Sequence, residues 1–147
     1  FIEALRRYAS AGNTRRATLL DSEPNGERAA TLLLEDAAHA YTNCDSARGC
    51  LLVAQAASQA SRSPAICAAL GAAMAEGNAV LRERLQRAVR EGDIAPDADV
   101  DAMTAFFAAV MAGLSVMAMN GADSEQLNTV VQTAMRAWPR AAQSPLV

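Results

Sequence analysis

Residues with the chemistry for catalysis or metal binding are few, and they do not group into a known motif. His39 is the only histidine of the chain, so any Ser/His/Asp or Cys/His device would have to use it, and no nucleophile motif surrounds it. Asp36 and His39 have the spacing of carboxylate-x-x-His ligands in di-iron helical bundles, but such sites need that motif twice. The spacing from His39 to Cys44 and Cys50 matches no zinc pattern. The sequence therefore predicts a protein that is not an enzyme and that carries no metal ion and no cofactor.

Two of the three cysteines have a pattern that fits thiol chemistry. Cys50 lies at the start of an apolar helix, where the positive helix end can lower the pKa of a thiol. Cys44 is near enough in sequence to act as a resolving partner. The competing interpretation is an inert cysteine, because cysteine is among the residues most often buried. A thiol-based redox or electrophile sensor that uses Cys50 is therefore the alternative function.

Isolated amide side chains on apolar helical stripes indicate a binding cavity. Asn78 follows Met74 by four residues, and Gln55 lies on the same face as Leu51 and Leu52, so both amides are expected to point inward. A buried amide without a partner costs about 1–3 kcal/mol, so each needs a hydrogen bond, a water molecule or a ligand. The alternative is that backbone groups satisfy both amides and that the methionines only fill space. The predicted ligand-binding residues, which have the composition of a mostly apolar pocket, are Leu52, Gln55, Met74, Asn78, Phe106, Phe107, Val110 and Met111.

Helical periodicity runs through the chain, and no alternating strand pattern is found. The clearest helix begins at Ser63-Pro64, where the serine caps free N–H groups and proline takes the first helical position, and ends at Glu91-Gly92. The first helix is expected to stop before Gly12-Asn13. The sequence therefore predicts an all-α fold, a bundle of about six helices, with the remaining helices at about 26–43, 48–60, 97–120 and 123–138.

The stretch 97–138 is expected to form a hairpin of two helices with more apolar surface than one core can cover. No charged residue occurs between Ala102 and Ala122, so the excess must meet something else, and we expect an identical subunit. One alternative is a helix buried in its own core. The other is a membrane span, which an Ala- and Gly-rich composition disfavours. Which side of the helix 97–120 meets the partner stays open. The predicted interface residues are Met103, Leu114, Met117, Leu127, Val130, Val131, Ala134 and Trp138.

Length and charge restrict the class of protein further. The 147 residues are enough for one core, and a net charge of −3 argues against a chain that binds nucleic acid by itself. An odd number of irregularly spaced cysteines and no signal-peptide pattern make a reduced, cytoplasmic setting the default. The sequence begins at Phe1, within a helical pattern, so we expect a part of a longer polypeptide.

Four segments, in this order, resemble the C-terminal regulatory domain of TetR-family transcriptional regulators. They are the run Ala47-Arg48-Gly49-Cys50-Leu51-Leu52-Val53, the long helix after Ser63-Pro64, the stop Arg90-Glu91-Gly92-Asp93-Ile94-Ala95-Pro96-Asp97-Ala98-Asp99, and Gly113-Leu114 ahead of Asn120-Gly121-Ala122. The resemblance covers nearly the whole chain. Its most specific parts are Gly-Cys-Leu-Leu-Val and Glu-Gly-Asp-Ile-x-Pro-Asp-x-Asp.

The resemblance implies an all-helical domain that binds a small hydrophobic inducer in an internal cavity. Its last two helices, an antiparallel pair, would form a four-helix bundle with those of a second subunit, giving a homodimer. Ligand occupancy would shift the separation of two N-terminal helix-turn-helix heads, which are absent here, and so release operator DNA. The expected organisation is a ligand-binding and dimerisation domain at 1–139, with a connecting helix at 1–11 and a dimerisation hairpin at 97–138, followed by a tail at 140–147. The predicted function is the effector-sensing domain of a TetR-like transcriptional repressor that contacts DNA only through another domain and does not enter a membrane.

Overall fold

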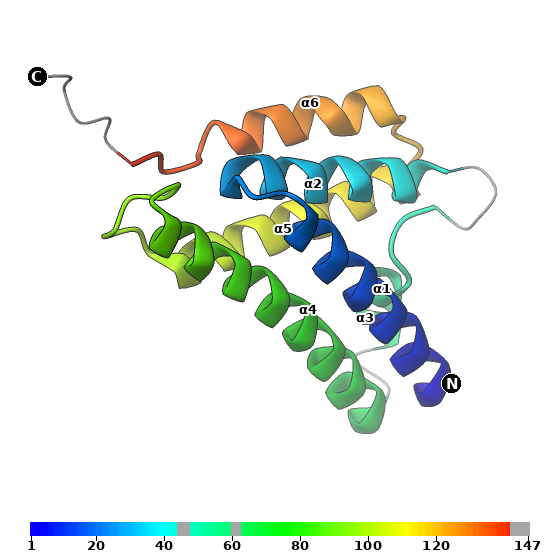
Figure 1. Cartoon of the computed structure of the whole chain (residues 1–147). Helices are drawn as coiled ribbons and strands as arrows, with labels where there is room; N and C mark the ends of the chain where they lie inside the picture. Colours follow the sequence, from blue (N-terminus) through cyan, green and yellow to red (C-terminus); the bar gives the residue numbers. More distant parts are fainter. Residues whose placement is uncertain (44–47, 60–62, 142–147) are drawn as a thin grey trace, which may run out of the picture.

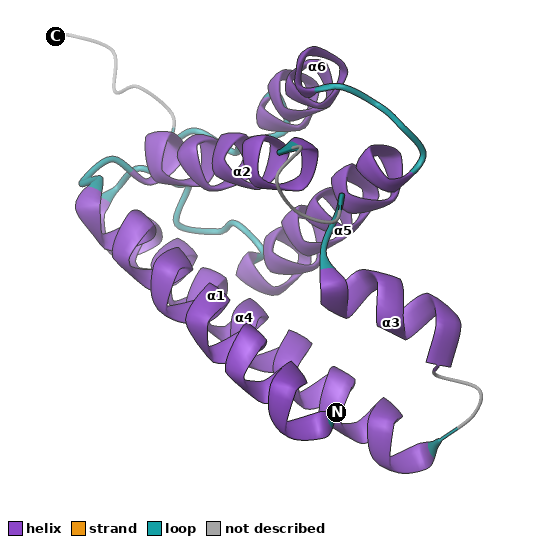
Figure 2. Ribbon diagram, turned by 90° about the vertical axis from the view of Figure 1, so that its right-hand side faces the viewer, coloured by secondary structure: helices purple, strands orange, loops and turns teal. Residues whose placement is uncertain are grey.

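The computed structural model describes residues 1–43, 48–59 and 63–141, and these residues form helices joined by short connections (Figures 1 and 2). The six helices of this part are α1 (Ile2–Ser22), α2 (Gly26–Thr42), α3 (Leu51–Gln59), α4 (Pro64–Glu91), α5 (Val100–Met119) and α6 (Ser124–Met135). Extended pairing within the same residues is limited to an isolated antiparallel bridge between Ile94 and Arg140. The predicted all-α bundle is therefore confirmed.

The helices pack in two groups around one core. α1 and α4 lie side by side and run in the same direction, whereas α5 and α6 form an antiparallel hairpin that α2 covers (Figures 1 and 2). α3 lies against α4 and α5. The largest fully buried side chains come from both groups, so they form a single core: Leu20, Leu34, Leu81, Leu85, Ile94, Phe107, Leu114, Leu127 and Val131.

Capping residues set several helix ends where the sequence predicts them. The Ser63 hydroxyl caps α4, and Gly92 ends that helix in the left-handed conformation with a φ of 83°. The carboxylates of Asp99 and Asp123 accept hydrogen bonds from the first turns of α5 and α6. These local signals identify α4 correctly at both ends.

The predicted end of the first helix is wrong. α1 does not stop before Gly12 but continues to Ser22. Gly12 does not adopt the left-handed conformation that commonly ends a helix, and a Cβ there would meet nothing within 4 Å. α1 packs against α4 along most of its length, and this tertiary contact outweighs the low helix propensity of one glycine.

The end of the hairpin and the start of the tail also differ from the prediction. α6 ends at Met135, and Trp138 lies beyond it with its side chain in the core. Arg140 is not part of a loose tail, because its Nε donates to Glu27 at 3.0 Å and its backbone pairs with Ile94. Residues 142–147 of the predicted tail lie outside the described residues.

Gly49, the first residue of the Gly-Cys-Leu-Leu-Val run, occupies a position that requires glycine. Its φ is +83°, and a Cβ there would lie 2.6 Å from Met119 Cγ and 2.9 Å from the Ser115 carbonyl oxygen. Only glycine allows this close approach to α5. The next backbone N–H, that of Cys50, donates to Ser115 Oγ at 2.7 Å. The run therefore fixes the start of α3 on α5.

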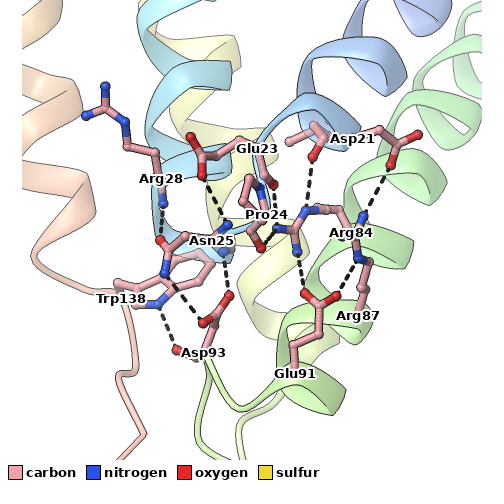
Figure 3. A network of polar contacts seen from close by, with 12 residues as sticks. Asp21, Glu23, Pro24, Asn25, Arg28, Arg84, Arg87, Glu91, Asp93 and Trp138 are labelled. Carbon is pink, nitrogen blue, oxygen red and sulfur yellow. Dashed lines mark hydrogen bonds and ion pairs between the residues drawn. The ribbon is translucent and has the colours of Figure 1, made fainter.

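Asp93, in the Glu-Gly-Asp-Ile-x-Pro-Asp-x-Asp motif, has a comparable structural role. Its Oδ2 accepts from the Gly26 N–H at 2.6 Å, and its Oδ1 accepts from Asn25 Nδ2 at 3.4 Å, at the start of α2 (Figure 3). Its backbone carbonyl accepts from Trp138 Nε1 at 3.4 Å. A single aspartate thus joins the end of α4 to the start of α2 and to the segment that follows α6.

Candidate ligand-binding site

A hollow with two adjoining lobes lies between α1, α2, α3, α4 and α5. The larger lobe, about 360 Å³, is formed mainly by α1 and α2, and the smaller, about 140 Å³, extends toward α4 and α5. The larger lobe is within the usual size range of small-molecule pockets. Residues that line both lobes form the boundary between them: Asn13, Arg16, Tyr41, Cys50, Leu52 and Met111.

The smaller lobe is mostly apolar. Met74 and Asn78 reach it from α4, while Ala108 and Ala112 reach it from α5. The two alanines are four residues apart on one helix face, so they leave space where larger side chains would fill it. Asn78 is the only amide of α4 in this lining and is half-buried.

Two tyrosines supply neutral hydroxyl groups to the larger lobe. Burial raises the pKa of Tyr8 and of Tyr41 above the usual value, and the neighbouring Cys50 raises both further. Arg16 has a smaller, opposing effect on the pKa of Tyr41. Both phenols are therefore protonated at neutral pH and available as hydrogen-bond donors and acceptors.

The structure places four of the predicted ligand-binding residues at the hollow and four elsewhere. Leu52, Met74, Asn78 and Met111 line it. Gln55 is half-buried on α3 and lines neither lobe.

The three remaining predicted residues lie on other faces of α5. Phe107 is buried in the core, with its ring centroid 5.2 Å from that of Phe106 and 6.1 Å from that of Trp138. Phe106 and Val110 lie on the outer side of α5, where they line a groove shared with α6. Their assignment to the cavity is therefore corrected. Because α5 is apolar on every side, its sequence does not show which face is turned toward α4.

Several residues outside the predicted set also line the hollow, and most of them come from the first two helices. Tyr8, Asn13 and Arg16 project from α1, and Tyr41 projects from α2. A first helix that ends at Ala11 does not contain Asn13 or Arg16, so the predicted boundary does not place these two residues on a helix face. Tyr8 and Tyr41 each stand at helical spacing with apolar residues of the sequence, and this spacing is the signal that could identify them.

The predicted interface residues divide between the core and the outer side of the hairpin. Met103, Met117 and Val130 are half-buried at the edge of the core. Ala134 is buried but lines the groove of about 320 Å³ between α5 and α6. The remaining four residues are buried within their own chain, because α2 packs against α5 and α6. Their assignment to a subunit interface is therefore corrected. They are Leu114, Leu127, Val131 and Trp138.

The residues predicted for thiol chemistry are only partly placed. Cys50 is half-buried, and its Sγ lies 4.0 Å from the Tyr8 hydroxyl, which donates to it. Cys44 lies outside the described residues. His39 is exposed on α2. Nothing in this geometry favours a thiol sensor over an inert, half-buried cysteine.

Comparison with known proteins gives a consistent result. Residues 27–137 match the family model described as "Tetracyclin repressor-like, C-terminal domain". The chain is 27% identical over 123 residues to the HTH-type transcriptional repressor ComR of Escherichia coli (strain K12), covering 84% of this chain but 59% of ComR. It thus spans somewhat more than half the length of that relative.

Solved structures of a longer protein have the same fold. A cysteine mutant of the TetR family transcriptional regulator CifR, in complex with 26 bp double-strand operator DNA, has a TM-score of 0.87 and 35% identity, over 93% of this chain and 71% of that chain. A second CifR mutant structure with operator DNA has the same TM-score and 36% identity, over 93% and 72% of the two chains. Together with the family match over most of the sequence, these relatives show that the chain belongs to the TetR family of transcriptional regulators and contains its C-terminal domain.

Proposed function

We propose that this chain is the effector-sensing and dimerisation domain of a TetR-like transcriptional repressor. A small, largely hydrophobic inducer would bind in the two-lobed hollow and cause release of operator DNA. The DNA contact would be made by a helix-turn-helix head outside this chain, in a cytoplasmic homodimer that does not enter a membrane. Support for the DNA contact comes from the relatives, because ComR is named an HTH-type repressor and CifR is in complex with operator DNA.

The observation that carries the proposal is the position of α1 at the hollow. Asn13 and Arg16 of α1 line both lobes, and α2, α3, α4 and α5 also contribute residues to the lining. A ligand there contacts α1 and the body of the domain at the same time. If it binds one position of α1 more tightly than another, it shifts the population toward that position. A head attached ahead of α1 would move with it.

The membrane alternative has a simpler explanation in the fold. α4 and α5 are each long and apolar enough to span a membrane by length and composition alone. Both contribute residues to the core, including Leu81 and Leu85 from α4 and Phe107 and Leu114 from α5. Core helices commonly have this composition, so we expect no membrane partner.

Filling the hollow tests whether it binds the effector. Ala40 is half-buried and lines the larger lobe, whereas the adjacent His39 is exposed and does not. We expect Ala40→Phe to weaken the binding of Nile red, a neutral apolar fluorophore, by about tenfold or more, because a ligand cannot share space with the new ring. We expect His39→Phe to bind as the unchanged protein does.

A second variant protects the test against a folding artefact. Ala112→Phe fills the smaller lobe from α5, and thermal denaturation followed by circular dichroism checks that each variant is folded. Any small molecule that co-purifies with the unchanged chain should be lost from both filled variants in native mass spectrometry. Unchanged binding in two folded, filled variants would show that the hollow is not the effector site.

A further inference from the structure

Arg16 is a cation at the boundary between the two lobes, and it has no acidic partner in the part of the chain that the structure describes. The neighbouring Arg15 pairs with Asp36, at 2.5 Å between Nη2 and Oδ1, and both of these residues line the larger lobe. Arg16 forms no ion pair with any carboxylate of residues 1–43, 48–59 or 63–141. The lining thus carries two arginines and one aspartate, which leaves one positive charge uncompensated.

Gly77 leaves space for the Arg16 guanidinium in this position. A Cβ on Gly77 would lie 2.2 Å from Arg16 Nη1 and 3.3 Å from its Cζ, and 3.0 Å from Asn13 Oδ1. Gly77 is buried in the interior of α4, where glycine lowers helix stability and alanine would be the better residue. The close approach gives this glycine a reason: the lack of a side chain leaves room for the guanidinium next to α4, at the boundary between the lobes.

The surroundings of Arg16 are neutral hydrogen-bonding groups and apolar side chains. The protonated phenol of Tyr41 and the amide of Asn13 line the same boundary. On the α4 and α5 side, Met74, Met111 and Ala108 make the smaller lobe apolar. A cation at the edge of an apolar space, with neutral donors beside it, is suited to an anionic group that is attached to an apolar body.

We infer that the hollow binds an amphipathic ligand with a single carboxylate, whose charge pairs with Arg16 and whose apolar body fills the lobe lined by Met74 and Met111. The inference rests on the proposed effector site and adds the chemical class of the effector. A guanidinium binds a carboxylate through two parallel N–H donors, so the charge gives both affinity and orientation.

Ligands that differ only in the head group test the inference. Calorimetric titration with hexanoate, octanoate and decanoate is compared with titration with the alcohols of the same length and with octylamine. We expect the best carboxylate to bind about tenfold or more tightly than its alcohol, since a charge-assisted hydrogen bond is stronger than a neutral one. Octylamine should bind more weakly than either.

Matched variants locate the preference at Arg16. Arg16→Gln should bind the alkanoate and the alcohol with similar affinity, whereas Arg7→Gln, an exposed arginine on the same helix, should keep the preference. Gly77→Ala should lose most of the preference because its methyl group displaces the guanidinium, while Gly71→Ala, where a Cβ meets nothing within 4 Å, should not.

The outcomes separate this inference from the proposed function. Equal binding of alkanoates and alcohols, or an unchanged preference in Arg16→Gln, overturns the anionic class and leaves the effector site in place if Ala40→Phe still blocks Nile red. Alkanoate binding that Ala112→Phe does not weaken places the apolar body outside the smaller lobe and overturns the inference. If, in addition, neither filled variant weakens the binding of Nile red, the proposed effector site is overturned as well. Failure of every alkanoate and alcohol to bind overturns the inference as well.

Discussion

Arg84 is a cation inside the core, and it joins α4 to the connection between α1 and α2. Its Nε donates to the Leu20 carbonyl at 3.1 Å, and its Nη2 donates to the carbonyls of Glu23 and Pro24 at 3.0 Å each (Figure 3). Its Nη1 makes no hydrogen bond within the described residues but lies 3.9 Å from the Glu91 carboxylate. A hydrogen bond from Arg87 lowers the pKa of Glu91, so this carboxylate remains charged. The end of α1 opposite the hollow is thus fixed by one side chain.

Replacing Arg84 with methionine tests this role. The apolar side chain keeps most of the packing but leaves three carbonyls without their donor, so we expect the free energy of unfolding to fall by about 2–4 kcal/mol. Arg82→Met is the matched control, because Arg82 is exposed and its one ion pair within the described residues is with Asp101, and such surface pairs contribute about 0–1 kcal/mol. Urea denaturation measures both. Equal losses in the two variants would contradict a structural role for the buried cation.

At the scale of the element, the sequence predicts helices well where capping residues mark their ends. Ser63, Gly92 and Asp123 identify three ends by chemistry that acts within one turn. The end of α1 was missed because contact with α4 decides it, and that contact is between residues far apart in sequence. The candidate site was likewise predictable only in part. The helical spacing of Met74 and Asn78 places both on the inward face of α4. α5 has no polar face, so its sequence does not show which of its residues point toward the hollow.

The capping box of α6 gives a prediction at this scale. Asp123 Oδ1 accepts from the Gln126 N–H at 2.9 Å, and Gln126 Oε1 accepts from the Asp123 N–H at 3.0 Å. Asp123→Ala removes both the cap and the favourable charge at the helix start, so we expect it to lower the free energy of unfolding by about 1 kcal/mol. Gln132→Ala, at an exposed position inside the same helix, should change it by less than about 0.5 kcal/mol. A difference of zero between the two variants in urea denaturation would show that the box does not hold the helix start.

At the scale of the whole molecule, the outer side of the α5–α6 hairpin remains apolar after the core is filled. Phe106 is 41% exposed, and Val110 and Val130 are half-buried around a groove of about 320 Å³. The inner side of the same hairpin packs on α2 and on the helices around the hollow. A second copy on the outer side would cover the groove, and the hairpin would then connect the effector site with the partner subunit.

A charge on this outer side tests the dimer directly. We expect the unchanged chain to sediment as a dimer at micromolar concentration. Val110→Glu should raise the dimer dissociation constant by about a hundredfold, because a two-fold symmetric interface contains each substitution in both subunits. Ala79→Glu is the control, since Ala79 is exposed on α4 and lies outside the hairpin and the hollow. A monomeric unchanged chain, or a Val110→Glu variant that dimerises as well as the control, would place the partner on another face. In that case the hairpin could not transmit ligand occupancy between subunits, and the shift of α1 would have to act within one chain.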